Sequence, residues 1–378
     1  MTKKFTGKRF LYLALTACVL VLVTAGHFTA FEGLNIETAA MVKSVGADID
    51  DKCHLTFVQN SVGESPQTVQ TALTAFGGNF TDAMNNLQLA SDKELTTGYV
   101  RNYLIGTDTA SKSMKSTMDF FGRSKTVQLS ANVYLAQDTA EEFLKSAARA
   151  KEEADGMLTD LQVTGERDGY YMPVTFSEAL SYMNGKNGGV LPVVKIVKVD
   201  STDEKMAQNA KFVGYGIVSG GRVVDYLDEK ASRGYNFAVG KLKRTTLTVG
   251  YNGDYAFDVD KTRSRVSFYV EDSKLKRINI SVRFTSSFSQ AADNVNFSEK
   301  MLNILEMKQE QTVKDEISAA VEKLRLTGVD FMRLEDKFAA VHPYWAREND
   351  NFSEILKDIE ISVDTSCKIV GTYDLEKV

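Results

Sequence analysis

Histidine is scarce in this sequence of 378 residues and occurs at only three distant positions, His27, His54 and His342. No two histidines have the helical spacing of a zinc site, and no paired-cysteine motif occurs. We expect His54 on the exposed face of a strand and His342 in a loop that ends a helix. The sequence therefore predicts no metal site and no cofactor.

Cysteine is equally rare, with Cys18, Cys53 and Cys367 as the complete set. Cys18 falls in an apolar run near the N-terminus, so Cys53 and Cys367 are the one pair that a disulfide within the rest of the chain could join. No spacing pattern links these two residues. Two separate buried thiols are therefore favoured over a disulfide.

An excess of positive charge is also absent. The chain carries 45 Lys and Arg residues against 50 Asp and Glu residues, which gives a formal net charge of -5. Because such a chain has no general attraction for polyanions, we expect no nucleic-acid partner. Hydrophobic residues make up 43% and charged residues 25%, as in ordinary globular proteins, and the length predicts two or three domains behind an N-terminal segment.

What the sequence does contain is a long apolar segment near its start. Four basic residues between positions 3 and 9 precede an uncharged stretch over residues 10–31, and acidic residues follow it. About 20 helical residues cross a bilayer, whereas the apolar part of a signal peptide usually has about 7 to 15. The positive-inside rule places the N-terminus in the cytoplasm. We therefore expect residues 1–31 to form a basic stub and a membrane anchor or signal, with the rest exported.

Lipidation is a second interpretation of the same segment. Leu15-Thr16-Ala17-Cys18 fits a lipobox, in which cleavage before Cys18 would leave a diacylglyceryl group on its sulfur. Apolar residues 19–23 follow directly, whereas a mature lipoprotein normally continues with a polar tether, so an uncleaved anchor is favoured. Cleavage within residues 25–30 is a third alternative. Cys18 is the lipidation candidate, and all three outcomes export the remaining chain.

Strand-like and helix-like segments alternate in the first part of the exported chain. Strands are expected at residues 39–49, 54–58, 99–105, 127–135 and 190–197, and helices at residues 66–75, 81–89, 107–121, 139–161 and 176–183. Such alternation favours a layered α/β or α+β structure over a β-sandwich or a helical bundle. A polar, charged stretch at 200–209 predicts the main domain boundary, between an N-terminal α/β region (32–204) and a C-terminal α+β domain (205–378).

The second region begins with a predicted hairpin, residues 212–218 and 222–227, because the glycines between them supply the positive φ of a tight turn. Further β-rich stretches up to residue 284 predict a mostly antiparallel sheet. The apolar period then changes to that of a helix over residues 296–326, with Gly328 as its C-cap. We therefore expect a multi-domain α+β protein of mixed sheets with covering helices, one of them long.

Candidate catalytic patterns fail on their spacing. The serine at 219 misses the nucleophile-elbow pattern by one residue, and no helix follows it to form a phosphate-binding loop. The aspartates of residues 48–51 lack the downstream glycine and glutamate of a calcium loop. The acidic residues of 225–229 are expected at an exposed strand end rather than as an acid/base pair. The sequence thus predicts no catalytic residues and no enzyme.

Several ordered stretches resemble the Ger(x)C family, the C subunits of bacterial spore germinant receptors, between about Leu34 and Tyr373. Residues 39–50 resemble the family's first strand and its Gly-Ile-Asp-like turn, with Ala47 in the middle position. The other similar stretches are residues 210–213 and 221–228 (a hairpin), 231–235 (a helical turn), 327–331 (the end of a helix), 342–345 (an aromatic loop) and 363–371 (a strand). Family members usually carry a lipobox cysteine just before the first strand, where this chain has Ala30-Phe31-Glu32.

The resemblance implies a non-enzymatic ectodomain on the outer face of the spore inner membrane. It would work with A and B membrane subunits in nutrient-triggered germination, without a cofactor. An extracytoplasmic solute-binding protein is the alternative, and ligand-dependent stabilisation would distinguish it. An envelope enzyme, a third class, needs a polar pocket that the sequence does not locate.

Overall fold

The computed structural model confirms an α+β protein with two mixed sheets. It describes residues 12, 14–19, 21, 39–62, 68–150, 154–169, 171–198, 208–251, 253–272, 274–290, 298–344 and 352–370. The predicted anchor lies mostly outside these residues. The described residues 14–19 are helical, and Cys18 is exposed with a free thiol. Among the described residues, no helix combines the length and the apolar character that crossing a bilayer requires.

The first sheet, in the described part of the chain, has nine strands in the order β3-β2-β1-β5-β6-β7-β8-β9, with β4 beside β1. At its centre β1, β5, β6 and β7 run parallel, and antiparallel pairs flank them. The strands are β1 (Ala39–Ile49), β2 (Cys53–Val62), β3 (Thr68–Gly77), β4 (Glu94–Thr96), β5 (Asn102–Gly106), β6 (Asn132–Ala136), β7 (Gly189–Lys198), β8 (Gln208–Ser219) and β9 (Arg222–Leu227).

Helices cover both faces of this sheet. One face packs against α2 (Phe80–Ala90), α3 (Thr107–Gly122) and α6 (Phe176–Asn184), and the other against α4 (Ala140–Ala150) and α5 (Ala154–Asp168). Successive side chains of a strand point to opposite faces. Tyr103 and Ile105 of β5 accordingly lie in the core with α3, and Leu104 lies in the core with α4. A strand covered on both sides has to be apolar throughout, which explains the unbroken apolar runs that the sequence shows here.

The predicted helix at residues 66–75 is wrong, because β3 pairs antiparallel with β2 along its whole length. Its sequence has β-branched Thr and Val at several positions, and such residues favour a strand when a neighbouring strand offers a pleated, half-buried surface. Helix α5 ends at Asp168, and Gly169 directly after it has φ +70°.

The second sheet, as described, has four strands: β10 (Arg244–Gly250), β11 (Asp254–Glu271), β12 (Lys274–Gln290) and β13 (Glu360–Ile369). The first three are antiparallel, as expected, whereas β13 runs parallel to β12. The helices of this part are α7 (Glu229–Ala238), α8 (Glu299–Thr327), α9 (Leu334–Val341) and α11 (Phe352–Asp358).

The long helix α8 confirms the predicted helix of the C-terminal half. Ser298 caps its first turn by accepting a hydrogen bond from the Met301 N–H, and Gly328, at φ 64°, ends it as expected. Its buried stripe covers one face of the second sheet. The Glu310 side chain strengthens this contact by accepting a hydrogen bond from the Cys367 N–H of β13, at 2.8 Å.

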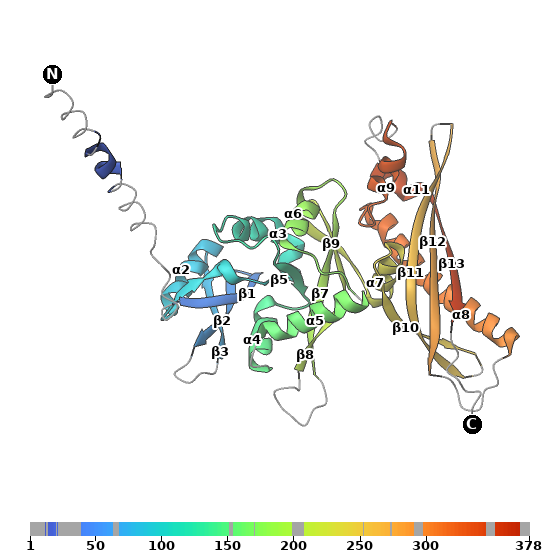
Figure 1. Ribbon diagram of the computed structural model, residues 1–378, viewed down its shortest axis with the longest axis horizontal. Coiled ribbons are helices and arrows are strands. Elements are labelled where there is room, and N and C mark those ends of the chain that lie inside the picture. The colour runs from blue at the N-terminus through green and yellow to red at the C-terminus, as the bar shows by residue number, and fades with distance from the viewer. Residues whose placement is uncertain are drawn as a thin grey trace, which may run out of the picture.

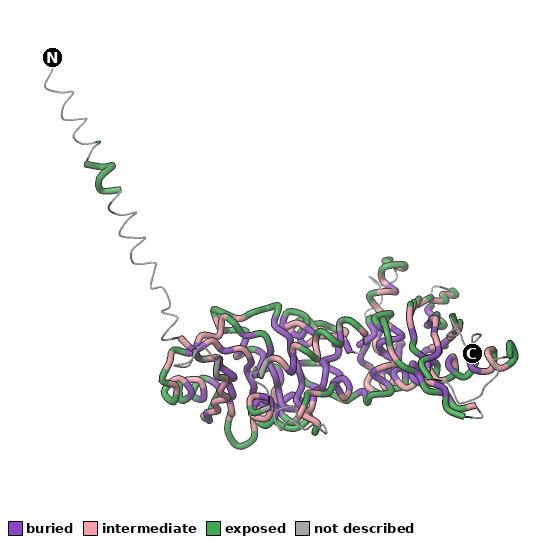
Figure 2. Tube along the Cα trace, turned by 60° about the horizontal axis from the view of Figure 1, so that its bottom comes forward, coloured by how far each residue is buried: buried purple, intermediate pink, exposed green. Residues whose placement is uncertain are grey.

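The two sheets lie along one long axis, with β1, β2 and α2 at one end, β12 and β13 at the other, and α7 between them (Figure 1). Buried residues run through both parts (Figure 2), and one core cluster contains Leu104 of the first sheet and Ile280 of the second. Strands β7 and β8 pair across the predicted boundary at residues 200–209, so residues of the predicted second region complete the first sheet.

Candidate functional site

The cysteines of the two sheets are separate free thiols, as predicted, but only Cys367 is buried and Cys53 is half-buried. Cys367 is buried on β13, and burial raises the pKa of its thiol to about 12. Burial also raises the pKa of Cys53 on β2. Because the thiolate is the nucleophile and the metal ligand, neither side chain is poised for such chemistry near neutral pH.

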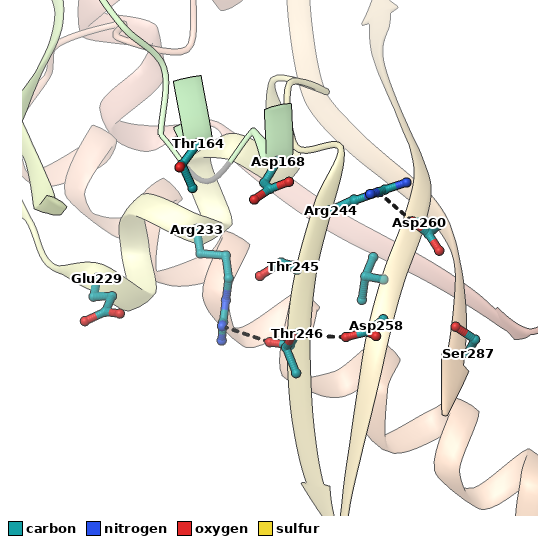
Figure 3. A pocket seen from close by; sticks show the side chains of 11 residues that line it. Thr164, Asp168, Glu229, Arg233, Arg244, Thr245, Thr246, Asp258, Asp260 and Ser287 are labelled. Carbon is teal, nitrogen blue, oxygen red and sulfur yellow. Dashed lines mark hydrogen bonds and ion pairs between the residues drawn. The ribbon is translucent and has the colours of Figure 1, made fainter. Parts of the chain in front are cut away.

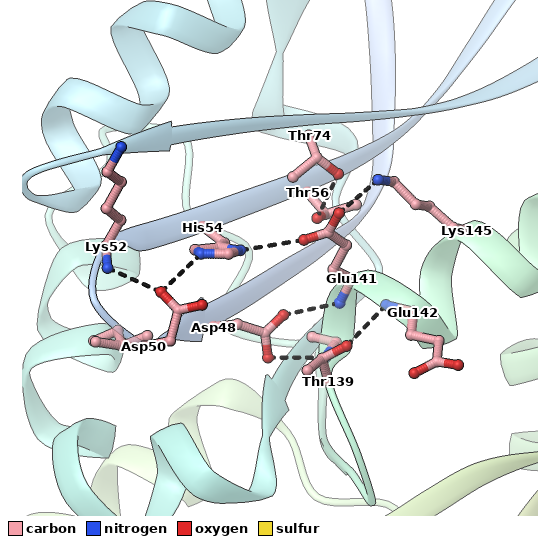
Figure 4. Close-up of polar contacts among 12 residues, drawn as sticks. Asp48, Asp50, Lys52, His54, Thr56, Thr74, Thr139, Glu141, Glu142 and Lys145 are labelled. Carbon is pink, nitrogen blue, oxygen red and sulfur yellow. Dashed lines mark hydrogen bonds and ion pairs between the residues drawn. The ribbon is translucent and has the colours of Figure 1, made fainter.

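His54 lies on β2, but its predicted position on the exposed face is wrong, since only 18% of its side chain is exposed. Helix α4 packs against this end of the strand (Figure 4). The Nδ1 atom of His54 lies 3.2 Å from Glu141, and its Nε2 atom lies 3.0 Å from Asp50. Burial raises the pKa of Glu141, but hydrogen bonds from Lys145 and His54 outweigh it and lower the pKa overall. An imidazole between two carboxylates ties the β1–β2 turn to α4.

Asp48, which lies beneath the imidazole in Figure 4, makes a further contact between β1 and the start of α4. It is only 7% exposed and accepts hydrogen bonds from the N–H groups of Ala140 and Glu141, both at 2.9 Å, so it caps the start of α4. Burial raises the pKa of Asp48 although both hydrogen bonds oppose the rise. In the described part of the chain, no cluster of three or more His, Cys, Asp or Glu side chains is arranged to hold a metal ion. The hydrogen bonds of Asp48 and His54 join the β1–β2 turn to the start of α4.

An open groove of about 590 Å³ lies between α5, α7 and the strands β10 to β12 (Figure 3). Its charged side chains already have hydrogen-bond or ion-pair partners, several of them outside the groove. Arg244 lies 3.5 Å from Asp260, and the Thr246 hydroxyl donates to Asp258 over 3.2 Å. The groove therefore offers polar groups that hold the strands together rather than a converging set for catalysis.

A larger cleft, of about 780 Å³, lies at the carboxyl ends of the parallel strands, where ligands of open α/β sheets usually bind. It is lined from both parts of the protein, by the start of α3, by Lys195 of β7 and by Lys323 of α8. Lys323 forms an ion pair with Asp225 over 2.7 Å. Of the predicted acidic group at 225–229, Asp228 caps α7 by accepting from the Ala231 N–H.

The junction between the two parts is built on the contact of α7 with α8. Gly234 of α7 lies so close to α8 that any Cβ atom there would overlap the carbonyl group of Glu316. Arg233 forms a two-pronged ion pair with the carboxylate of Glu316, of which the Nε contact measures 2.8 Å. Glu316 is only 2% exposed. Residues 231–235, one of the stretches that resemble the Ger(x)C family, therefore contain the glycine that lets α7 approach α8 and the arginine of the buried ion pair.

A row of aromatic rings crosses the same junction. Tyr171 stacks on Phe212 at a centroid distance of 5.3 Å, and Phe212 lies 5.0 Å from Tyr215. Tyr215 lies 5.4 Å from Tyr235 of α7, which in turn lies 5.7 Å from Phe331 after α8. Each such pair contributes about 0.5 to 1.5 kcal/mol beyond its buried area. The first sheet and the segment after α8 are thus joined by one continuous apolar contact.

Asp330, next to the last of these rings, is a buried titratable group. It is 1% exposed and accepts hydrogen bonds from the N–H groups of Leu334 and Glu335, at 2.8 and 2.7 Å, at the start of α9. Burial outweighs these hydrogen bonds and raises the pKa of Asp330 to about 7. The folded state therefore binds this proton more tightly than the unfolded chain does.

This raised pKa predicts a pH dependence. The protonated Asp330 side chain stabilises the folded state. This contribution is fully present below the unfolded pKa near 4 and is lost as the pH rises through about 7. We expect the thermal midpoint of the full chain in detergent to fall between about pH 5 and pH 8, and Asp330→Asn to give a lower but flatter profile. The control is Asp315→Asn, at an exposed side chain of α8. An unchanged slope in Asp330→Asn would contradict the assignment.

Comparison with known proteins gives two matches in chain order. Residues 33–196 match the spore germination protein N-terminal domain, and residues 213–373 match the spore germination B3/GerAC-like C-terminal domain. No curated protein matches the chain. Among solved structures the chain is similar to the crystal structure of the GerBC protein, with 18% identity, a TM-score of 0.58, and coverage of 86% of this chain and 97% of that one.

These matches agree with the resemblance drawn from the sequence. At 18% identity the structural similarity shows the fold, whereas the two domain matches together cover most of the chain. The stretches 231–235 and 327–331, which carry that resemblance, meet where Tyr235 packs on Phe331. The sequence resemblance gives no reason for these particular residues, whereas the contact between Tyr235 and Phe331 does. The chain therefore belongs to the GerAC-like spore germination family, the family of germinant receptor C subunits.

Proposed function

We propose that the protein is the C subunit of a spore germinant receptor and that it acts without catalysis, beside A and B membrane subunits, in nutrient-triggered germination. The observation that carries this proposal is the ordered match of both family domains. In the described residues, the two parts of the protein are joined by a packed junction, and the polar networks hold neighbouring elements together. Such a protein fits the role of a binding component in a membrane complex.

We further propose that the ectodomain lies on the outer face of the spore inner membrane, behind an anchor formed by residues 10–31. The order of basic, apolar and acidic residues supports this orientation. Mass spectrometry of the mature N-terminus is expected to find the segment uncleaved, and Cys18→Ser to stay in the membrane fraction. An acylated Cys18 at the N-terminus would replace the anchor by a lipid. A tag after Val378 that is inaccessible from outside would overturn the orientation.

Deletion tests the role in germination. Removal of this gene together with any paralogues is expected to abolish germination by nutrients, while a non-nutrient trigger still works. Re-expression of the chain restores the response if the protein acts as a receptor subunit. Normal nutrient germination in the deletion strain would overturn the proposal.

The cleft at the carboxyl ends of the parallel strands favours a second candidate, a solute-binding protein. Its lysine and carboxylate lining suits a small zwitterionic solute. A ligand at a hundredfold excess over its dissociation constant stabilises a protein by about 2.7 kcal/mol. Thermal unfolding of the full chain against a panel of amino acids distinguishes the two, because a receptor subunit that binds no solute shows no shift.

A further inference from the structure

The amino ends of the parallel strands β4, β5 and β6 form one edge of the first sheet, residues 91–101 and 122–131, which we call the amino edge. Its two segments are joined by a hydrogen bond between the hydroxyl groups of Thr97 and Thr126, at 2.7 Å. The described part of β1 starts at the same edge, where Ala39 pairs with Glu94 of β4. At the opposite, carboxyl edge, Lys323 of α8 lines the larger cleft.

Large apolar side chains are exposed on and beside the amino edge. Tyr99 is 51% exposed, Leu129 is 53% exposed, and Leu89 at the end of α2 is 85% exposed. The Nζ atom of Lys43 lies over the Tyr99 ring, 5.7 Å from its centroid. Tyrosine and lysine together are typical of membrane–water interfaces, where the ring and the aliphatic stem sit in the apolar zone and the polar ends stay in water.

An apolar cavity of about 310 Å³ lies directly behind this edge. Thr97 and Ser124 of the amino edge line it on one side, and Val45, Phe57 and Phe121 line it from the core. An apolar cavity beside exposed apolar side chains is unusual on a surface that faces only water. The edge therefore has the composition of a surface that meets an apolar phase.

The charge of the amino edge is opposite to that of the whole chain. Within the amino edge, cationic side chains outnumber acidic ones by four to two: Lys93, Arg101, Arg123 and Lys125 against Asp92 and Glu94. The formal net charge of the complete protein is -5. A local positive excess on an acidic protein complements an anionic surface.

The connection to the predicted anchor is short. Seven residues, 32–38, separate the end of the apolar segment from Ala39. Seven residues span at most about 25 Å when fully extended. If residues 10–31 lie in the bilayer, the amino edge is therefore held close to the membrane surface.

We infer that the amino edge rests on the surface of an anionic bilayer, with Tyr99 and Leu129 in its interfacial zone. The inference rests on the proposed membrane anchoring and adds an orientation to it. The first sheet stands on the membrane by its amino edge, and the carboxyl-edge cleft, the junction and the second sheet extend away from the surface.

The test uses the full chain in vesicles of phosphatidylglycerol and phosphatidylcholine whose acyl chains are brominated. Trp345→Phe removes the single tryptophan, and Tyr99→Trp or Leu129→Trp then introduces a reporter on the edge. Tyr269→Trp is the matched control, because Tyr269 on β11 is also 51% exposed. We expect brominated lipid to quench the reporters at 99 and 129 and not the reporter at 269. Added salt should weaken the quenching.

The outcomes separate the inference from the proposed anchoring. Protein that floats with the vesicles but shows no quenching at 99 and 129 is anchored with the edge turned away, which overturns the inference alone. Protein that does not float overturns the anchoring and the inference together. Equal quenching at all three positions would also overturn the proposed orientation.

Discussion

Gly234→Val is expected to destabilise the full chain by about 3 kcal/mol or to prevent its accumulation. The new side chain would overlap the Glu316 carbonyl of α8, and a backbone group cannot move aside as a flexible side chain can. Neither helix can shift freely, because Tyr235 and Phe237 of α7 are buried on one side and Ile317 of α8 on the other.

Gly122→Ala is the matched control for this prediction. A Cβ atom at Gly122, in the last turn of α3, would make only ordinary contact with Phe176 at 3.8 Å. Alanine is the better helix former by about 1 kcal/mol, so this variant should be as stable as the wild type or more stable. Denaturant unfolding of both variants in detergent checks the prediction. Wild-type stability of Gly234→Val would show that α7 and α8 are not in backbone contact.

The elements that the sequence predicted well are those whose pattern is local. The helix α8 shows an apolar stripe over many turns and a terminal glycine, and both signals come from neighbouring residues. The hairpin β8–β9 follows from Gly220 and Gly221, whose φ values of 59° and 81° match the expected turn. The strand β3 was missed because its pairing with β2 is set by tertiary contact, which outweighs local propensity.

The candidate site was harder to predict, since its partners lie far apart in the chain. Arg233 and Glu316 are separated by 83 residues, and nothing in either neighbourhood indicates the other. A signal for Gly234 did exist, because a glycine within a helix that otherwise packs well often marks a close approach. The group that requires this glycine, the Glu316 carbonyl, is on α8 and follows only from how α8 packs on α7.

Replacing Arg233 by methionine is expected to cost about 3 to 5 kcal/mol, the second large effect at the junction. The substitution leaves the carboxylate of Glu316 without its cation at a position where 3% of the side chain is exposed. Arg244→Met is the matched control, because the pair of Arg244 with Asp260 is 69% and 45% exposed and contributes at most about 1 kcal/mol.

The double variant Arg233→Met/Glu316→Met decides what the pair contributes. An apolar pair of similar volume avoids the cost of burying two charges, so the double variant should recover most of the stability that the single variant loses. If the double variant is no more stable than Arg233→Met, the unpaired carboxylate of Glu316 is not the cause of the stability that the single variant loses. Spores that carry the recovered double variant then report on function. Normal nutrient germination in them would mean that the junction acts through its rigidity, and lost germination with restored stability would assign the charge pair itself a part in the response.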